Sequence, residues 1–178
     1  MKLLPGRESI VQEAIETCSL AQMAFASLGN LTTVPYLRHE VMEASARMLL
    51  EKLLSLAIKA RFLDDQTGIL KDYDRRLLTI GKYYENGALK DDEISIRLVL
   101  NKLIHNRTIS VGTDALTCVI FPADASAPPE SRKIPNGTHH RDLVIVTVEA
   151  QYRDKEWRFE IDLFQFLNEL VRTLENEI

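Results

Sequence analysis

Apolar residues recur every three or four positions through much of the first 106 residues, a spacing that places them on one face of an α-helix. The first such pattern runs from Glu8 to Leu28, and the following Gly29-Asn30 favours a helix end. The second begins near Pro35, which suits a first helical turn, and continues for about six turns to Leu63. Much of the circumference of its second half is apolar, so we expect this helix to be central and to contact neighbours on several sides.

Two further helices are predicted before Arg107. Glycines interrupt the pattern between Asp64 and Lys90, but the apolar positions there can still form a short helix: Leu77, Leu78, Ile80, Tyr83 and Tyr84. Asp91-Asp92-Glu93 then places negative charge where a helix N-terminus favours it, and helical spacing returns from Ile94 to Ile104. Four helical segments with short connections predict an antiparallel bundle over residues 8–106.

Beyond Arg107 the period of the apolar positions changes from about 3.6 residues to 2, which is typical of β-strands. β-branched and aromatic residues dominate four segments: 108–111, 116–121, 143–152 and 157–162. The last two flank a polar turn and predict a hairpin with one apolar face. A two-stranded hairpin alone is marginally stable, so this face should pack on a helix. Asp162 is in a position to cap the N-terminus of such a helix, whose apolar residues would run from Leu163 to Leu174.

These elements predict an α+β protein: an antiparallel helical bundle followed by a small antiparallel β-sheet and a C-terminal helix. A chain of 178 residues is long enough for a substantial core, so we expect residues 1–178 to form a single compact unit. Residues 8–106 would form the bundle, and residues 107–178 the sheet and the final helix. The connection over 122–141 is rich in Pro, Ala and Ser, and connections of such length are often mobile or functional.

The composition, 46% hydrophobic and 27% charged residues, is that of a folded globular protein. A net charge of −4 argues against attraction of the whole molecule to nucleic acid or an anionic membrane, although a local basic patch is compatible with it. No apolar stretch approaches the ~18 residues of a membrane span, so we expect a cytoplasmic protein without membrane contact. Cys18 and Cys118 lie in apolar patterns and predict buried free thiols. Glycine motifs for phosphates or dinucleotides are missing, and no cofactor is expected.

One helical stretch carries candidate chemistry. Arg97, Asn101 and His105 follow one another at intervals of four residues and would form one polar ridge, bordered by Ile94, Leu98 and Ile104. A histidine can deprotonate a ribose 2′-hydroxyl, and a guanidinium can stabilise the charge of the resulting phosphorane without a metal. The alternative is that Asn101 and His105 are polar residues at a helix end, where a cation such as protonated His105 is favoured.

The run Leu100-Asn101-Lys102-Leu103-Ile104-His105 resembles the motif of HEPN-type domains, which are small helical bundles of prokaryotic toxins and defence proteins. That motif is an Arg, four to six residues and a His, often with an Asn directly after the Arg. Asn101 and His105 match it, Leu100 occupies the Arg position, and Arg97 lies one helical turn before Asn101. The resemblance extends over residues 8–106. It implies a homodimer through the motif helices, and either a metal-independent ribonuclease or a catalytically silent binding module.

Two function hypotheses follow from these residues. Because Leu100 replaces the Arg, the first is a non-catalytic HEPN-like dimeric module that binds RNA or a protein partner, in a bacterial stress, toxin–antitoxin or defence setting. The second is a metal-independent endoribonuclease in which His105 is the general acid/base, Asn101 orients the substrate and Arg97 replaces the missing Arg.

Two other polar clusters carry less chemistry. His139-His140 lies near basic residues of the long connection, which predicts either a solvated loop or a flexible phosphate contact: Arg132, Lys133 and Arg141. The acidic cluster at Asp64-Asp65, Asp72 and Asp74 lacks the spacing of a calcium loop. We expect it to be a charged surface turn, and no metal site is predicted.

Overall fold

The structure is a computed structural model that describes residues 6–26, 35–70, 80–119, 138–152 and 155–175. These residues form, in chain order, the following elements: α1 (Arg7–Ala26), α2 (Pro35–Thr67), β1 (Gly81–Glu85), β2 (Ala88–Asp91), α3 (Ile96–Ile104), β3 (Thr108–Val119), β4 (Thr138–Tyr152), β5 (Lys155–Asp162) and α4 (Leu163–Glu175). The strands make one antiparallel sheet with the order β2-β1-β5-β4-β3. The predicted α+β class is confirmed.

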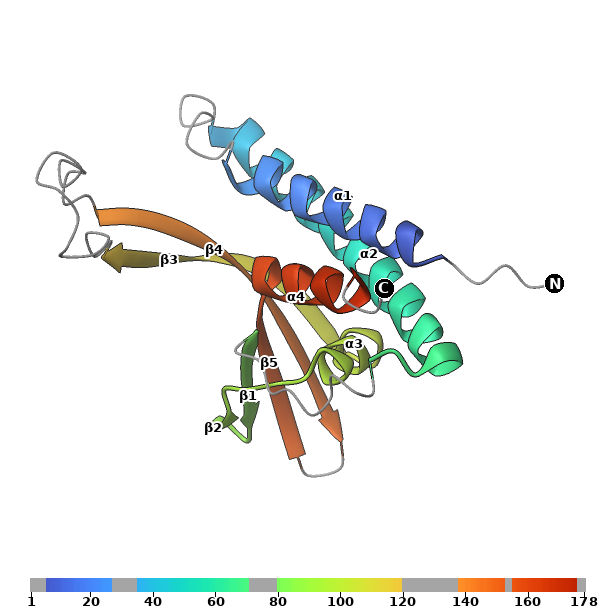
Figure 1. Ribbon diagram of the computed structural model, residues 1–178. Helices are drawn as coiled ribbons and strands as arrows, with labels where there is room; N and C mark the ends of the chain where they lie inside the picture. Colours follow the sequence, from blue (N-terminus) through green and yellow to red (C-terminus); the bar gives the residue numbers. More distant parts are fainter. Residues whose placement is uncertain (1–5, 27–34, 71–79, 120–137, 153–154, 176–178) are drawn as a thin grey trace, which may run out of the picture.

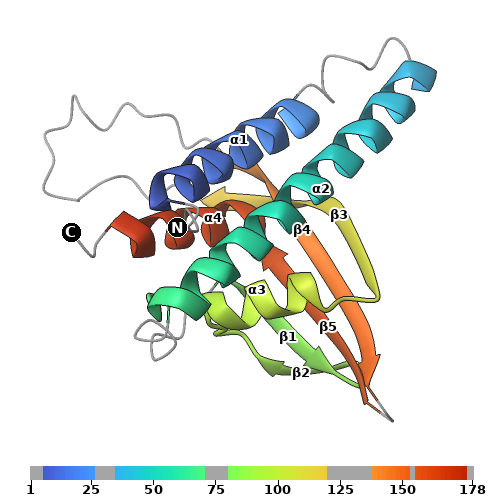
Figure 2. The ribbon, with the colours of Figure 1, turned by 90° about the vertical axis from the view of Figure 1, so that its right-hand side faces the viewer.

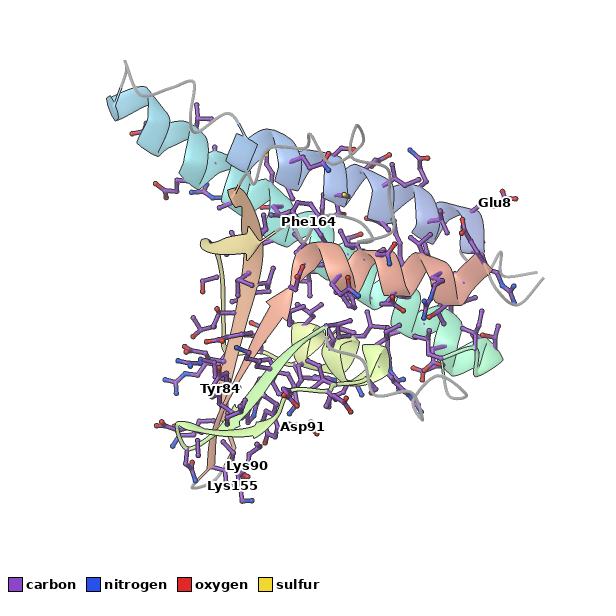
Figure 3. The ribbon with its side chains drawn as sticks, turned by 60° about the vertical axis from the view of Figure 1, so that its left-hand side comes forward. Glu8, Tyr84, Lys90, Asp91, Lys155 and Phe164 are labelled. Carbon is purple, nitrogen blue, oxygen red and sulfur yellow. The ribbon has the colours of Figure 1, made fainter. Side chains whose placement is uncertain are left out.

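The sheet has one face covered by helices and one open face. α3 and α4 lie on the same side of it, while the Tyr84 side chain extends from the other side (Figure 3). On the covered face, successive inward residues of β4 and β5 are at most 1% exposed: Val144, Val146, Val148, Phe159 and Ile161. Tyr83 and Phe159 stack there with ring centroids 4.6 Å apart. Because side chains alternate along a strand, the residues between these project from the open face.

α2 is the central helix, as its pattern predicts, since it contacts α1, α3 and β3. α1 packs along it, and Lys59 of α2 donates to the nearly buried Glu13 of α1 across 2.6 Å (Figure 1). The apolar core between the helices and the sheet comes from α2, α3 and α4, including Leu49, Leu53, Leu56, Val99, Leu103, Phe166 and Leu170. In the part of the chain that the structure describes, no helix combines the length and apolarity needed to cross a bilayer.

The prediction of a helix around Tyr83 and Tyr84 is wrong, because residues 81–85 form β1. Residues 71–79 lie outside the described residues. β1 and β2 are joined by Asn86 and Gly87, with φ of 49° and 77°. A two-residue turn with two positive φ angles matches the twist of a hairpin, and Asn-Gly is its strongest sequence signal. Residues 8–106 therefore contain a hairpin as well as helices. It joins the later sheet, because β1 pairs with β5.

The remaining elements match the expectations more closely. The segments predicted separately at 108–111 and 116–121 form one strand, β3, up to Val119, where this described range ends, and β3 pairs along its length with β4. The predicted cap of the last helix is confirmed, since the Gln165 amide donates to Asp162 Oδ1 across 3.0 Å. The N-cap of α3 is Ser95, and not one of the acidic residues before it. Ser95 Oγ accepts a hydrogen bond from the Leu98 amide at 3.2 Å. Cys18 is a partly buried free thiol, and burial raises its pKa.

Candidate functional site

Arg97, the proposed substitute for the arginine of the HEPN-type motif, is part of an ion-pair cluster around the buried carboxylate of Asp64. Its Nε lies 3.0 Å from Asp64 Oδ2, and Arg61 Nη1 lies 2.7 Å from the same oxygen. The Leu70 amide donates to the other oxygen of Asp64 across 2.9 Å. The Asp64 side chain is 0% exposed, so the expectation of a surface turn is wrong for this residue. Arg97 thus joins α3 to the C-terminal end of α2.

Asn101 and His105 lie further along α3. Arg97, Leu98 and Asn101 border a shallow hollow of about 430 Å³ together with Asp91 and other residues before the helix. His105 is not among its lining residues. His105 caps the C-terminus of α3, where its amide donates to the Asn101 carbonyl at 3.0 Å, and its side chain is exposed. The structure therefore brings Arg97 and Asn101 to one hollow and leaves His105 outside it.

Leu100, at the position of the family's arginine, belongs to the core with 0% exposure. None of the side chains from Ile96 to Ile104 is fully exposed, because α3 packs on α2, on α4 and over β5. Lys102 makes the contact with β5: its Nζ lies 4.0 Å from the centre of the Trp157 ring, and burial lowers the pKa of Lys102. The motif helix therefore offers little surface to a second copy of the chain.

A different polar site lies on the open face of the sheet. Four residues form one row across β1, β5, β4 and β3, each directly opposite the next: Tyr84, Arg158, Glu149 and Thr108. They line a hollow of about 430 Å³ with Arg107, Gln151 and Glu156, among others. The residues that line the hollow thus include two aromatic, two cationic and two anionic residues, the aromatic ones being Tyr84 and Trp157. It is built from strands that are distant in the sequence.

Contacts with Tyr84 and with Glu160 hold Arg158 in a defined orientation. Its guanidinium carbon lies 4.5 Å from the centre of the Tyr84 ring, and its Nη2 lies 3.0 Å from Glu160 Oε1. The Tyr84 hydroxyl donates to Glu160 Oε2, also across 3.0 Å. Arg158 nevertheless keeps 45% of its side chain exposed. Arg107 is exposed directly before β3, and among the described residues it has no ion-pair partner.

Part of this site was predictable from the sequence. The alternation along 143–152 and 157–162 assigns Glu149, Arg158 and Glu160 to the polar face. Tyr84 and Arg107 had no such signal, because the participation of β1 and the strand registers are contacts between distant segments. Near the edge of this region, Glu85 Oε1 lies 2.6 Å from Lys155 Nζ, and this hydrogen bond holds the pKa of the carboxyl below its usual value. Lys90 and Lys155 lie close together at the end of the sheet in Figure 3.

The structure describes part of the acidic cluster that includes Asp64-Asp65 and part of the cluster around His139-His140. Asp65 is half exposed and pairs with Arg61 at 2.9 Å, whereas Asp72 and Asp74 lie outside the described residues. The backbone of His139-His140 belongs to β4, opposite Cys118 and Thr117, and Arg132 and Lys133 lie outside the described range. No group of three potential metal ligands occurs among the residues that the structure describes.

Comparisons with known proteins found no related protein. A scan against protein-family models, a search of curated proteins and a search of solved structures each gave no match. The resemblance to HEPN-type domains therefore stays a prediction that rests on Asn101 and His105.

Proposed function

We propose that this protein is a non-catalytic binding module that takes a single-stranded RNA segment on the open face of its sheet. The observation that carries the proposal is the row of Tyr84, Arg158, Glu149 and Thr108 across four strands, beside the exposed Arg107. An open face of this kind leaves room for an extended chain, because the helices of the core pack on the other face.

The chemistry of the row suits unpaired bases. Bases in single-stranded RNA stack on aromatic rings and on guanidinium planes. Arg158 is supported from one side by the Tyr84 ring and is still 45% exposed, so its guanidinium offers a supported stacking surface. Arg107 can contact a phosphate, and the acceptor oxygens of Glu149 can read an amino group at a base edge. The balanced charge of the hollow favours base recognition over general attraction to the phosphate backbone.

The surroundings of the HEPN-like motif support the non-catalytic form of the proposal. Arg97, which would have to stabilise a phosphorane, is paired with the buried Asp64. Leu100 lies in the core, where the family's motif carries its arginine. The resemblance extends the proposal to a dimeric HEPN-like module in a stress or defence setting, in keeping with the silent members of that family.

RNA binding can be tested by fluorescence anisotropy with a short labelled single-stranded RNA of mixed sequence. Replacing Arg158 by Ala should raise the dissociation constant at least about fivefold, because stacking contributes about 1–3 kcal/mol per base. Arg107→Ala should reduce the slope of log K against log salt by about 0.7, as expected for one lost phosphate contact to a single strand. Arg172→Ala is the matched control, since Arg172 is 50% exposed and ion-paired like Arg158 but lies on α4, on the covered side of the sheet. No saturable binding, or an equal loss in all three variants, would reject the proposal.

The endoribonuclease alternative keeps one observation in its favour, which is that the His105 side chain is exposed. The same RNA is incubated with the wild type and with His105→Ala in the presence of a metal chelator. Intact RNA in both samples, together with binding, supports the non-catalytic module. Cleavage that disappears in His105→Ala would instead establish the enzyme and overturn the non-catalytic assignment.

A further inference from the structure

An apolar stripe lies on the outer side of α2. Leu54, Ile58 and Phe62 are 37%, 52% and 43% exposed, and their spacing of four residues aligns them along the helix. The side chains that α2 buries, such as Leu53 and Ala60, point to the opposite side. Among the six large apolar side chains that are exposed in the described residues, four lie on α2, since Met48 is 55% exposed as well. In Figure 2, α2 lies in front of the sheet.

Charged residues continue this stripe in both directions along α2. Arg47 and Glu51 precede Leu54, and Arg61 and Asp65 follow Ile58. The six positions 47, 51, 54, 58, 61 and 65 are separated alternately by four and three residues, which is the spacing of a coiled-coil seam. Along the helix the seam therefore reads positive, negative, apolar, apolar, positive, negative.

We propose that α2 forms the interface of a symmetric homodimer, in which the two α2 helices pack antiparallel with Leu54 opposite Ile58 of the partner subunit. This register places Glu51 opposite Arg61 of the partner subunit and Arg47 opposite Asp65 of the partner subunit. It also places Phe62 beside Met48 of the partner subunit on the same flank of the seam, and Met48 is 55% exposed in one chain. All four charged contacts in the two-fold dimer then join opposite charges.

Other arrangements of the same two helices are disfavoured by charge. A parallel pair would place every seam residue opposite its own copy, so that Arg47 faces Arg47 of the partner subunit. An antiparallel pair centred on Ile58 would place Glu51 opposite Asp65 of the partner subunit. Arg61 can serve both chains, because a guanidinium has five donors and its bonds to Asp64 and Asp65 leave others available.

This interface differs from the expected one through the motif helix, and it does not depend on RNA binding, because the RNA surface lies on the open face of the sheet. Ile15 offers a matched control: it is an isoleucine on a helix, and both Ile15 and Ile58 are 52% exposed. A glutamate at position 58 would bring two like charges together at the centre of the dimer, whereas a glutamate at position 15 would lie outside the interface.

Sedimentation equilibrium on the full chain under reducing conditions tests the proposal. The wild type should be a dimer, Ile15→Glu should remain one, and Ile58→Glu should raise the dissociation constant at least about a hundredfold with an unchanged circular dichroism spectrum. Arg47→Glu and Asp65→Arg should each weaken the dimer about threefold or more, and the double variant should recover it. A monomeric wild type or a dimeric Ile58→Glu would overturn the interface, and failure of the double variant to recover would overturn the register.

Discussion

Arg97 of α3 and Asp64 of α2 form an ion pair of 3.0 Å, in which the carboxylate is 0% exposed. Arg61 and the Leu70 amide complete the partners of this carboxylate. A buried carboxylate is tolerated because each oxygen accepts a hydrogen bond or faces a cation. The pair holds α3 against α2, so Arg97 makes a structural contact at a position where the sequence suggested a catalytic role.

Removing the charge of Asp64 should therefore destabilise the fold. Asp64→Asn leaves two guanidinium groups around a neutral side chain, and breaking a buried pair in this way costs about 3–5 kcal/mol. Asp65→Asn is the control, because Asp65 is half exposed and should change stability by less than about 1 kcal/mol. Urea unfolding followed by circular dichroism measures both. Equal midpoints for the two variants would contradict the structural role of Asp64.

Introducing the arginine of the HEPN-type motif at position 100 should not create a nuclease. Leu100→Arg introduces a guanidinium at a side chain that is 0% exposed among core residues, and burying an unpaired charge costs more than about 4 kcal/mol. We expect an insoluble or largely unfolded protein. Leu98→Arg is the control, since Leu98 is only partly buried on the same helix. A folded Leu100→Arg variant with the thermal midpoint of the wild type would show that this position is not core.

The turn between β1 and β2 should depend on its glycine. Gly87 has a φ of 77°, where a side chain costs about 1–2 kcal/mol, so Gly87→Ala should lower the free energy of unfolding by about that amount. Gly112→Ala is the matched control, because a Cβ there meets no atom within 4 Å and its φ is not positive. Chemical denaturation distinguishes the two. A loss as large for Gly112→Ala would argue against backbone strain as the cause.

The Glu85 carboxyl should titrate below its ordinary range. The hydrogen bond from Lys155 is the largest cause of its lowered pKa, and Lys90 at 3.8 Å has a smaller effect. NMR titration should show the pKa of Glu85 rising toward its usual value in Lys155→Met and much less in Lys90→Met. A lowered folded pKa stabilises the protein above the usual carboxyl pKa, and this contribution is lost as the pH falls through the folded value. Equal shifts in the two variants would contradict the assigned order of causes.

Much of the secondary structure was predictable because its signals are local. The helical periods of α1, α2 and α4 place their buried residues on one face, and the Asp162 cap follows from its position before an apolar helix. The alternation of Val144, Val146 and Val148 predicts their burial. The β1–β2 hairpin also had a local signal in Asn86-Gly87, but the apolar residues before it were compatible with a helix.

The candidate sites were decided by contacts between distant segments. Arg97 reads as a catalytic candidate from its spacing to His105, and only the packing of α3 on α2 reveals that it faces Asp64. On the open face, Tyr84 donates a hydrogen bond to Glu160, which is 76 residues away in the sequence, so no short-range pattern brings them together. The sequence by itself determined the α+β class and the apolar face of each of these elements, since periodicity is a property of neighbouring residues. The tertiary structure alone decided which polar groups are buried as pairs and which share a hollow, because strand register and helix packing set those distances.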